Sequence, residues 1–124
     1  MRKDQASIMF TDADEIASNE GLIIVEPLPN ELQIDIDSPI IPKSYNDQRD
    51  ILCVFKSITN HRITTSKSGN KHIYIQLKDP ITPVERILLQ LALGSDPVRE
   101  LLTYHNILDP TNLRPQFLFE VKPK

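Results

Sequence analysis

The sequence contains a single cysteine and no long apolar run. The lone Cys53 excludes an internal disulfide and is typical of a reducing compartment; within "ILCVFKSI" we expect it to be a small buried apolar residue. No apolar stretch is long enough to span a bilayer, and residues 1–21 lack the continuous apolar segment of a signal peptide. These absences predict an intracellular, cytoplasmic protein that has no membrane partner.

The sequence also lacks a block of basic residues, and its formal net charge is −3. A protein that holds duplex DNA through many phosphates is usually basic, because its affinity comes from the release of counterions. Any nucleic-acid binding by this chain therefore has to be local, weak, assisted by metal ions or helped by a partner. The charge balance counts against a simple DNA-binding module.

What is present is typical of one small globular domain. The chain has 124 residues, of which 40% are hydrophobic and 25% charged, so we expect a single core. Residues 1–20 are polar and acidic and are expected to form a flexible N-terminal segment. Residues 21–124 are then expected to form a single domain.

The spacing of apolar residues predicts the order of helices and strands. Strands are expected at 21–27, 31–37, 61–66, 71–77 and 116–121, and helices within 44–60, 82–94 and 95–108. Thr82 can cap the second helix, Glu85 can complete a capping box, and Gly94 suits its C-terminal end. The short connection at 28–30 predicts that the first two strands pair as a hairpin.

From residue 31 onward the predicted order is strand, helix, strand, strand, helix pair, strand. This is the βαββαβ pattern of ferredoxin-like and RNA-recognition-motif folds. We therefore predict an α+β fold with a ferredoxin-like/RRM-like βαββαβ core, an extra N-terminal hairpin strand, and helices on one face of an antiparallel sheet. Strands 31–37 and 71–77 are expected to be central neighbours, and the second face of the sheet is expected to be open.

Alternation along the strands assigns each residue to one of these two faces. The helix-facing positions are expected to be Ile34, Ile36, Ile73, Ile75, Leu77, Phe117, Phe119 and Val121. The open face is expected to carry Gln33, Asp35, Asp37, His72, Tyr74, Gln76, Leu118 and Glu120. Three carboxylates and one histidine, from three strands far apart in the sequence, would converge there.

Asp35 and Asp37, in "NELQIDID", point to the same side of a strand. On a solvated strand face water screens their repulsion, and strands with one wet face are common. A divalent cation would instead turn the repulsion into attraction, since carboxylates are preferred ligands of Mg²⁺ and, with imidazole, of Mn²⁺. Convergence with His72 and Glu120 favours the metal site.

A glycine-bearing turn flanked by lysines, "KSGNK", directly precedes His72. Backbone N–H groups of such a turn can come close to a phosphate. An ordinary hairpin turn and a surface histidine are the common alternatives for these residues.

These stretches resemble two motifs of the archaeo-eukaryotic primase (primase-polymerase) superfamily. "LQIDID" resembles the first motif, a hydrophobic strand that ends in Asp-x-Asp, and "SKSGNKHIYI" resembles the second, a small-residue turn followed by histidine and a hydrophobic strand. The resemblance covers roughly residues 30–120. It implies an RRM-like catalytic core in a minimal phage- or plasmid-type member. The sequence departs from typical members of the superfamily in that it is shorter and shows neither a zinc-binding Cys/His cluster nor a helicase domain.

The resemblance also implies roles for single residues. Asp35 and Asp37 would bind Mg²⁺ or Mn²⁺, and His72 would contact the phosphates of an incoming nucleotide. The further nucleotide-binding residues would be Lys67, Ser68, Gly69 and Lys71. A third motif, a hydrophobic residue followed by an acid, matches "LFE" and makes Glu120 the third metal ligand. Asp96 is the alternative, although capping of a helix explains it without a metal.

The function implied is that of a DNA primase or polymerase, a metal-dependent nucleotidyltransferase with Asp35, Asp37 and His72 as catalytic residues. Two metal ions would assist the transfer of a nucleotide to a 3′-hydroxyl. Nucleoside triphosphates, a single-stranded template and other replication proteins would be its partners. The alternative is a non-catalytic nucleotide-binding or protein-partner module of a replication complex.

Two other interpretations are disfavoured. A rolling-circle nickase needs paired histidines, whereas His61, His72 and His105 are scattered. Arg86, Arg99 and Arg114 could contact template or nucleotide phosphate, but such residues are more often solvated helix and loop charges.

Overall fold

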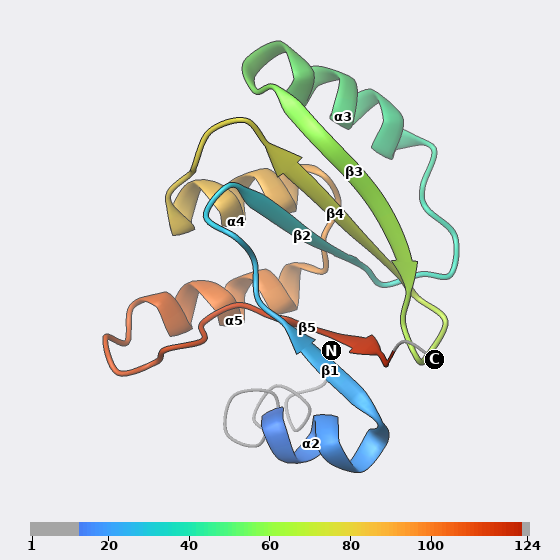
Figure 1. Cartoon of the computed structure of the whole chain (residues 1–124). Helices are drawn as coiled ribbons and strands as arrows, with labels where there is room; N and C mark the ends of the chain where they lie inside the picture. The colour runs from blue at the N-terminus through green and yellow to red at the C-terminus, as the bar shows by residue number, and fades with distance from the viewer. Residues whose placement is uncertain (1–12, 123–124) are drawn as a thin grey trace.

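The computed structural model describes residues 13–122 and has an α+β fold (Figure 1), as the sequence predicts. Within these described residues, four helices accompany two antiparallel sheets, one of three strands in the order β2-β4-β3 and one of two strands, β1 and β5. The helices are α2 (Ala13–Glu20), α3 (Ser44–Phe55), α4 (Pro83–Ala92) and α5 (Pro97–Ile107). The strands are β1 (Leu22–Val25), β2 (Glu31–Ile36), β3 (Ile58–Thr65), β4 (Lys71–Leu77) and β5 (Leu118–Val121).

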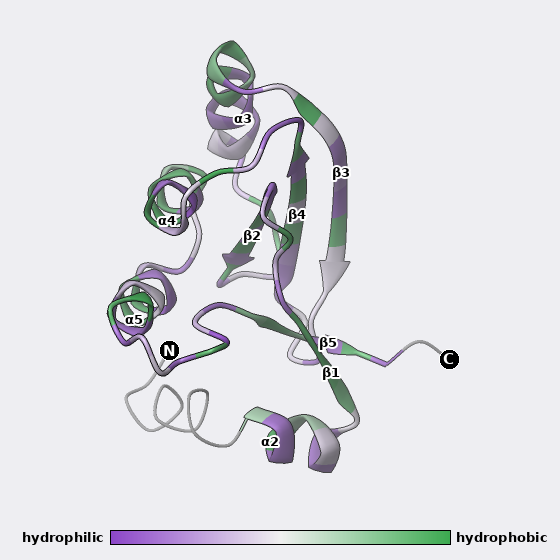
Figure 2. Ribbon diagram, turned by 60° about the vertical axis from the view of Figure 1, so that its left-hand side comes forward, coloured by the Kyte–Doolittle hydropathy of each residue, from purple (hydrophilic) through white to green (hydrophobic). Residues whose placement is uncertain are grey.

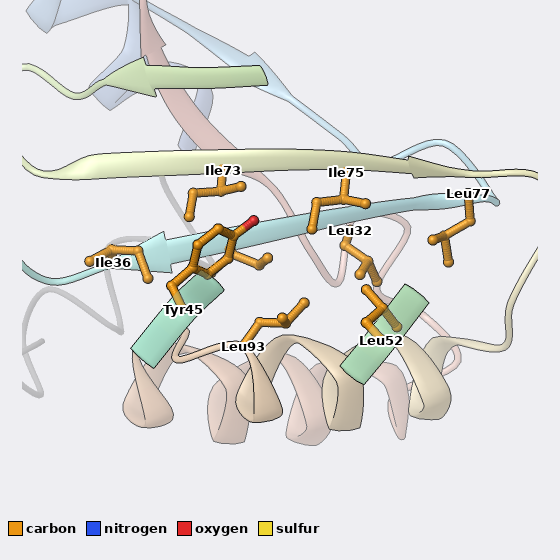
Figure 3. Packing of buried hydrophobic residues seen from close by; sticks show 9 residues of the cluster. Leu32, Ile36, Tyr45, Leu52, Ile73, Ile75, Leu77 and Leu93 are labelled. Carbon is orange, nitrogen blue, oxygen red and sulfur yellow. The ribbon is translucent and has the colours of Figure 1, made fainter. Parts of the chain in front are cut away.

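The main core lies between the three-stranded sheet and the helices. Alternate residues of β2 and β4 point into it, which confirms the predicted faces of these two neighbouring strands. Figure 3 shows these side chains meeting Tyr45 and Leu52 from α3 and Leu93 from the end of α4. The buried strand residues of this core are Leu32, Ile34, Ile36, Ile73, Ile75 and Leu77.

The caps of α4 and α5 follow the sequence signals. The Thr82 side chain accepts a hydrogen bond from Glu85 N at 3.1 Å, and Gly94 adopts a φ of 90° after the helix, a left-handed conformation that glycine adopts at little cost. Asp96 caps α5 by accepting from Val98 N at 2.9 Å. These local interactions fix where the two helices begin.

The outer edge of β2 is closed by the segment from α4 to α5, not by a fourth strand. Residues Glu31, Gln33 and Asp35 point their backbone groups away from β4, and all six groups are hydrogen-bonded. The partners are Leu28 O, Arg86 Nε, Gln90 Oε1, Arg99 Nη1, Ser95 Oγ and Asp96 N. Since unpaired strand edges are costly to bury, these contacts explain why β5 does not pair there.

Arg86 and Arg99 are therefore not solvated helix charges, which the sequence had favoured. Arg99 is 1% exposed and forms an ion pair with the buried Glu100, at 2.7 Å between Nη1 and Oε2. Its Nη2 also donates to Phe117 O at 3.2 Å, so that this side chain joins β2 to the segment before β5. Arg114, by contrast, forms a partly exposed pair with Asp14.

The strands β1 and β5 pair with each other, so the expected hairpin between β1 and β2 is wrong. The β1–β5 ribbon packs across part of the sheet face that was expected to be open. Gln33 donates to Val25 O at 2.8 Å, and Tyr74 donates to Glu120. Gln33, His72 and Tyr74 are consequently buried.

The apolar residues around β5 form a second, small core. Phe117 and Phe119 pack with Ala13 of α2 and Ile24 of β1, while Val121 is exposed. The sequence predicted that these three residues face the helices of the main core. This prediction is wrong, because β5 pairs with β1 in the other sheet and not with β2.

Other expectations are also corrected in α2 and α3. Part of the 1–20 segment lies outside the described residues, and residues 13–20 form α2. Cys53 is exposed and not buried, and so are Ile51, Val54 and Phe55, because only Tyr45 and Leu52 of α3 point fully into the core. No helix within residues 13–122 has the length and apolar character needed to cross a membrane.

Candidate functional site

The register of β2 and β4 brings Asp35 and His72 together. The two residues are paired across the antiparallel ladder, so their side chains stand next to each other on one face. His72 Nε2 lies 3.6 Å from Asp35 Oδ1. The two motifs found in the sequence therefore meet in space, and their contact depends on strand pairing that the motifs themselves do not encode.

Asp37 follows the end of β2 and meets the turn before β4. Asn70 Nδ2 donates to Asp37 Oδ1 at 3.1 Å. The turn is held by hydrogen bonds within it, among them Ser66 N to Asn70 O at 2.8 Å and Gly69 N to Ser66 O at 2.9 Å. Gly69 has a φ of 94°, a conformation that residues with a side chain rarely adopt.

These residues line one cavity with a volume of about 770 Å³. Its lining includes carboxylates and residues of the polar turn at 66–70. Apolar side chains complete the lining. The lining residues are Asp35, Asp37, His72, Asp96, Ser66, Lys67, Ser68, Asn70, Glu20, Ile16, Leu22, Leu118 and Phe119. A volume between about 300 and 1,000 Å³ is typical of sites for small molecules and cofactors.

Glu120 does not line this cavity. It lies next to Nδ1 of the His72 ring, whereas Asp35 lies next to Nε2. Glu120 Oε1 lies 3.2 Å from His72 Nδ1, close enough for an ion pair but outside good hydrogen-bond geometry. Its Oε2 accepts from Thr64 Oγ1 at 2.7 Å and from the Tyr74 hydroxyl. Both oxygens of the expected third metal ligand are thus directed at protein groups, which favours a role in orienting the histidine.

Asp96, the alternative third acid, lines the cavity beside Asp35. Its backbone N donates to Asp35 O at 2.8 Å, and the preceding Ser95 Oγ accepts from Asp35 N at 3.0 Å. Ser95 in turn donates to the buried Glu100 at 2.7 Å. The start of α5 is therefore pinned to the strand that carries Asp35, and the geometry favours Asp96 over Glu120 as the third carboxylate of the cavity.

The cavity is rich in negative charge. Burial raises the pKa of Asp35 against the lowering effects of Arg99 and His72, and Asp96 and Asp37 raise it further. A cation near Asp35 would relieve this repulsion. Within residues 13–122, no three His, Cys, Asp or Glu side chains are grouped closely enough to form a complete metal site by themselves.

Some of the residues that line the cavity were predicted from the sequence, and others were not. Lys67 and Ser68 line the cavity, whereas Gly69 and Lys71 do not, and Lys71 Nζ donates instead to Thr65 Oγ1 at 2.8 Å. Ser66 and Asn70 also line the cavity. They could have been predicted, because they are next to Lys67, Ser68 and Gly69 in the same polar turn. The α2 residues of the wall had no such signal, because their approach depends on tertiary packing.

Acid titration should reveal the contacts of Glu120. Burial alone would raise the pKa of Glu120, but contacts with His72, Tyr74 and Thr64 outweigh burial and leave the pKa below the ordinary 4.5. Ionised Glu120 should therefore stabilise the fold above pH 4.5, and this contribution should be lost as the pH falls through the lower folded-state pKa.

The measurement is urea unfolding of the wild type and Glu120→Gln across acid pH, followed by circular dichroism. The difference between the two free energies of unfolding should be largest near neutral pH and should shrink on acidification. A difference that is constant or grows toward acid pH would contradict this role for the ionised carboxylate.

The chain matches no protein-family model, no curated protein and no solved structure.

Proposed function

We propose that the chain is a metal-dependent nucleotidyltransferase of the primase or polymerase type, which transfers a nucleotide to a 3′-hydroxyl. The proposal rests on one observation. Asp35, Asp37 and His72 line the same cavity as the polar turn that carries Lys67. These are the residues of the two sequence motifs. The carboxylates of this cavity could hold a divalent cation, its polar turn could hold a triphosphate, and its apolar side chains could contact a base.

Asp35 and Asp37 fit a divalent cation by their chemistry and position. Both are oxygen donors that line the cavity, and Asp96 is a third carboxylate of its lining. Mg²⁺ is commonly held by one or two carboxylates together with substrate phosphates, so a complete protein cage is not required. When bound, Mg²⁺ or Mn²⁺ would neutralise the triphosphate and stabilise the attacking and leaving oxygens.

The remaining groups would bind and orient the nucleotide. His72, Lys67 and the hydroxyl of Ser68 can hold phosphate oxygens, while Glu120 orients the His72 ring. The apolar wall, with Leu118 and Phe119, offers a surface for the base. Glu20 and the three aspartates outnumber the cationic groups, so we expect a free triphosphate to be repelled and its binding to require the metal.

We also propose that the three-stranded sheet and its helices form a ferredoxin-like core. The order β2-β4-β3 and the placement of α3, α4 and α5 on one side of this sheet (Figure 2) support a ferredoxin-like core. In this chain the place beside β2 is taken by side chains of α4 and α5, and β5 lies in the β1–β5 ribbon.

The first test is calorimetric titration of Mn²⁺ and a nucleoside triphosphate into the wild type and an Asp35→Asn/Asp37→Asn variant. We expect Mn²⁺-dependent nucleotide binding by the wild type and none by the variant. The matched control is Asp47→Asn/Asp50→Asn, which makes the same charge change at exposed positions of α3 and should bind as the wild type does.

Extension of a primer or of a first nucleotide on a single-stranded template then tests catalysis. Binding that requires the aspartates, without any transfer, would support the non-catalytic nucleotide-binding alternative. A folded wild type that binds no nucleotide in the presence of Mn²⁺ would overturn the proposal and would favour a protein-partner module.

A further inference from the structure

The outward faces of α4 and α5 are apolar. The two helices contact each other in the layer beside the three-stranded sheet (Figure 2). On α4 the exposed apolar residues are Val84, Leu88 and Leu91. On α5 and at its C-terminal end they are Val98, Leu101, Tyr104 and Leu108. We call these seven residues the α4–α5 face; each is between 36% and 66% exposed.

These helices bury polar and charged residues as well as apolar ones, unlike an ordinary surface helix. A surface helix usually buries its apolar stripe and shows charged residues to water. Here Arg86, Gln90 and Arg99 point inward and bond to the edge of β2. Glu100 is buried beside them and pairs with Arg99. Much of the apolar surface of the two helices is left outside, without a partner in the described fold.

The α4–α5 face also lacks charge. No Asp, Glu, Lys or Arg occupies an exposed position of α4 or α5, both of which lie entirely in the described residues. The half-buried Glu85 of α4 shows 40% of its side chain and pairs with Lys56. A quarter of the residues in the chain are charged, so this surface differs from the composition of the whole. Depletion of charge is characteristic of the core of a protein–protein interface.

The area of the face is in the range that an interface requires. From their exposed fractions, the seven residues expose roughly 600 Å² together, at the upper end of the patches seen on monomers. A standard interface buries about 800 Å² on each partner, and the neighbouring Pro83, Ala92 and Pro97 are exposed as well.

We infer that the α4–α5 face binds a second copy of this chain in a two-fold symmetric dimer. In such a dimer the same patch meets itself, so a charged patch would face its own charges. An uncharged patch avoids that repulsion, although the chain as a whole is negative. The two helix pairs would then pack into a four-helix arrangement. This inference goes beyond the proposed function and does not depend on it.

The test is sedimentation velocity of the full chain over the micromolar range, together with a Leu88→Glu/Leu101→Glu variant. We expect the wild type to approach twice the 14.2 kDa mass of the chain as its concentration rises. The variant should stay at the monomer mass with an unchanged circular dichroism spectrum, because both substitutions are on the solvent side of their helices. The control, Leu113→Glu, alters a residue that is 89% exposed outside the face and should dimerise as the wild type does.

A wild type that stays monomeric throughout this range overturns the inference. If deletion of residues 1–12 then produced a dimer, the N-terminal segment, and not a second copy, would be the occupant of the face in the full chain. Equal weakening of the dimer by Leu113→Glu would also count against the α4–α5 face, because it would show that added charge at any position is sufficient.

Discussion

Replacing Arg99 with methionine should lower the free energy of unfolding by about 3–5 kcal/mol, because it leaves a buried carboxylate without its cation. Arg99 and Glu100 are 1% and 0% exposed, so water cannot replace the lost partner. The substitution also removes the donors to Gln33 O and Phe117 O. A domain of this size is stable by only about 5–15 kcal/mol, so the variant should lose a large part of its stability.

Urea unfolding followed by circular dichroism at neutral pH measures this loss. Arg114→Met is the matched control, because Arg114 also forms an ion pair at 2.7 Å but with the exposed Asp14. A surface pair contributes about 1 kcal/mol or less, so the control should change stability little. Similar losses in the two variants would show that Arg99 does not stabilise the fold through buried charge.

A double variant separates two costs of Arg99→Met, namely the unpaired charge of Glu100 and the lost hydrogen bonds. Arg99→Met/Glu100→Gln keeps hydrogen-bonding groups at position 100 but removes its charge. We expect it to be more stable than Arg99→Met alone, because the unpaired carboxylate is gone. A double variant that is less stable than Arg99→Met would place the cost in the hydrogen bonds to Ser95 and Gln90.

Glu120→Gln and Asp96→Asn should affect the site in different ways, provided that the cavity binds a metal–nucleotide complex. Glu120 contacts His72 and not the cavity, so Glu120→Gln should weaken nucleotide binding by about 10- to 100-fold, the usual effect of removing a group that orients a ligand. Binding of Mn²⁺ alone should change little. Asp96→Asn should instead weaken Mn²⁺ binding, while asparagine preserves the cap of α5.

Calorimetry with Mn²⁺ alone and with Mn²⁺ and a nucleoside triphosphate separates the two effects. Nitrogen-15 NMR of the His72 ring adds a readout that a general loss of stability would not produce, because its shifts report where the ring protons lie. These shifts should change in Glu120→Gln and stay the same in Asp96→Asn. The opposite pattern, with Mn²⁺ affinity lost only in Glu120→Gln, would restore Glu120 as the third ligand.

The sequence by itself determined the local structure and the two motifs. Alternating isoleucines assigned the faces of β2 and β4 correctly, because each residue advances a strand by a fixed step. Thr82, Asp96 and Gly94 marked helix ends, because capping involves residues only a few positions apart. Asp35 and His72 were expected to share a face, and they do.

Only the tertiary structure decided the partners of β1 and β5 and the closure of the edge of β2. A polar residue on a helix has the same local sequence signal whether it faces water or a strand edge. For this reason the sequence predicted, wrongly, that Arg99 is a solvated charge. Its burial depends on Gln33 and Phe117, which are 66 and 18 positions away.

The same dependence on distant contacts separates Glu120 from Asp96. Both are acids that the motifs allow, and spacing along the chain cannot rank them. The β1–β5 ribbon turns Glu120 toward His72, and the hydrogen bond from Asp96 N to Asp35 O brings Asp96 to the cavity. Interactions between residues close in the sequence determined where the helices and strands form. Contacts between residues far apart in the sequence determined which side chains share the site.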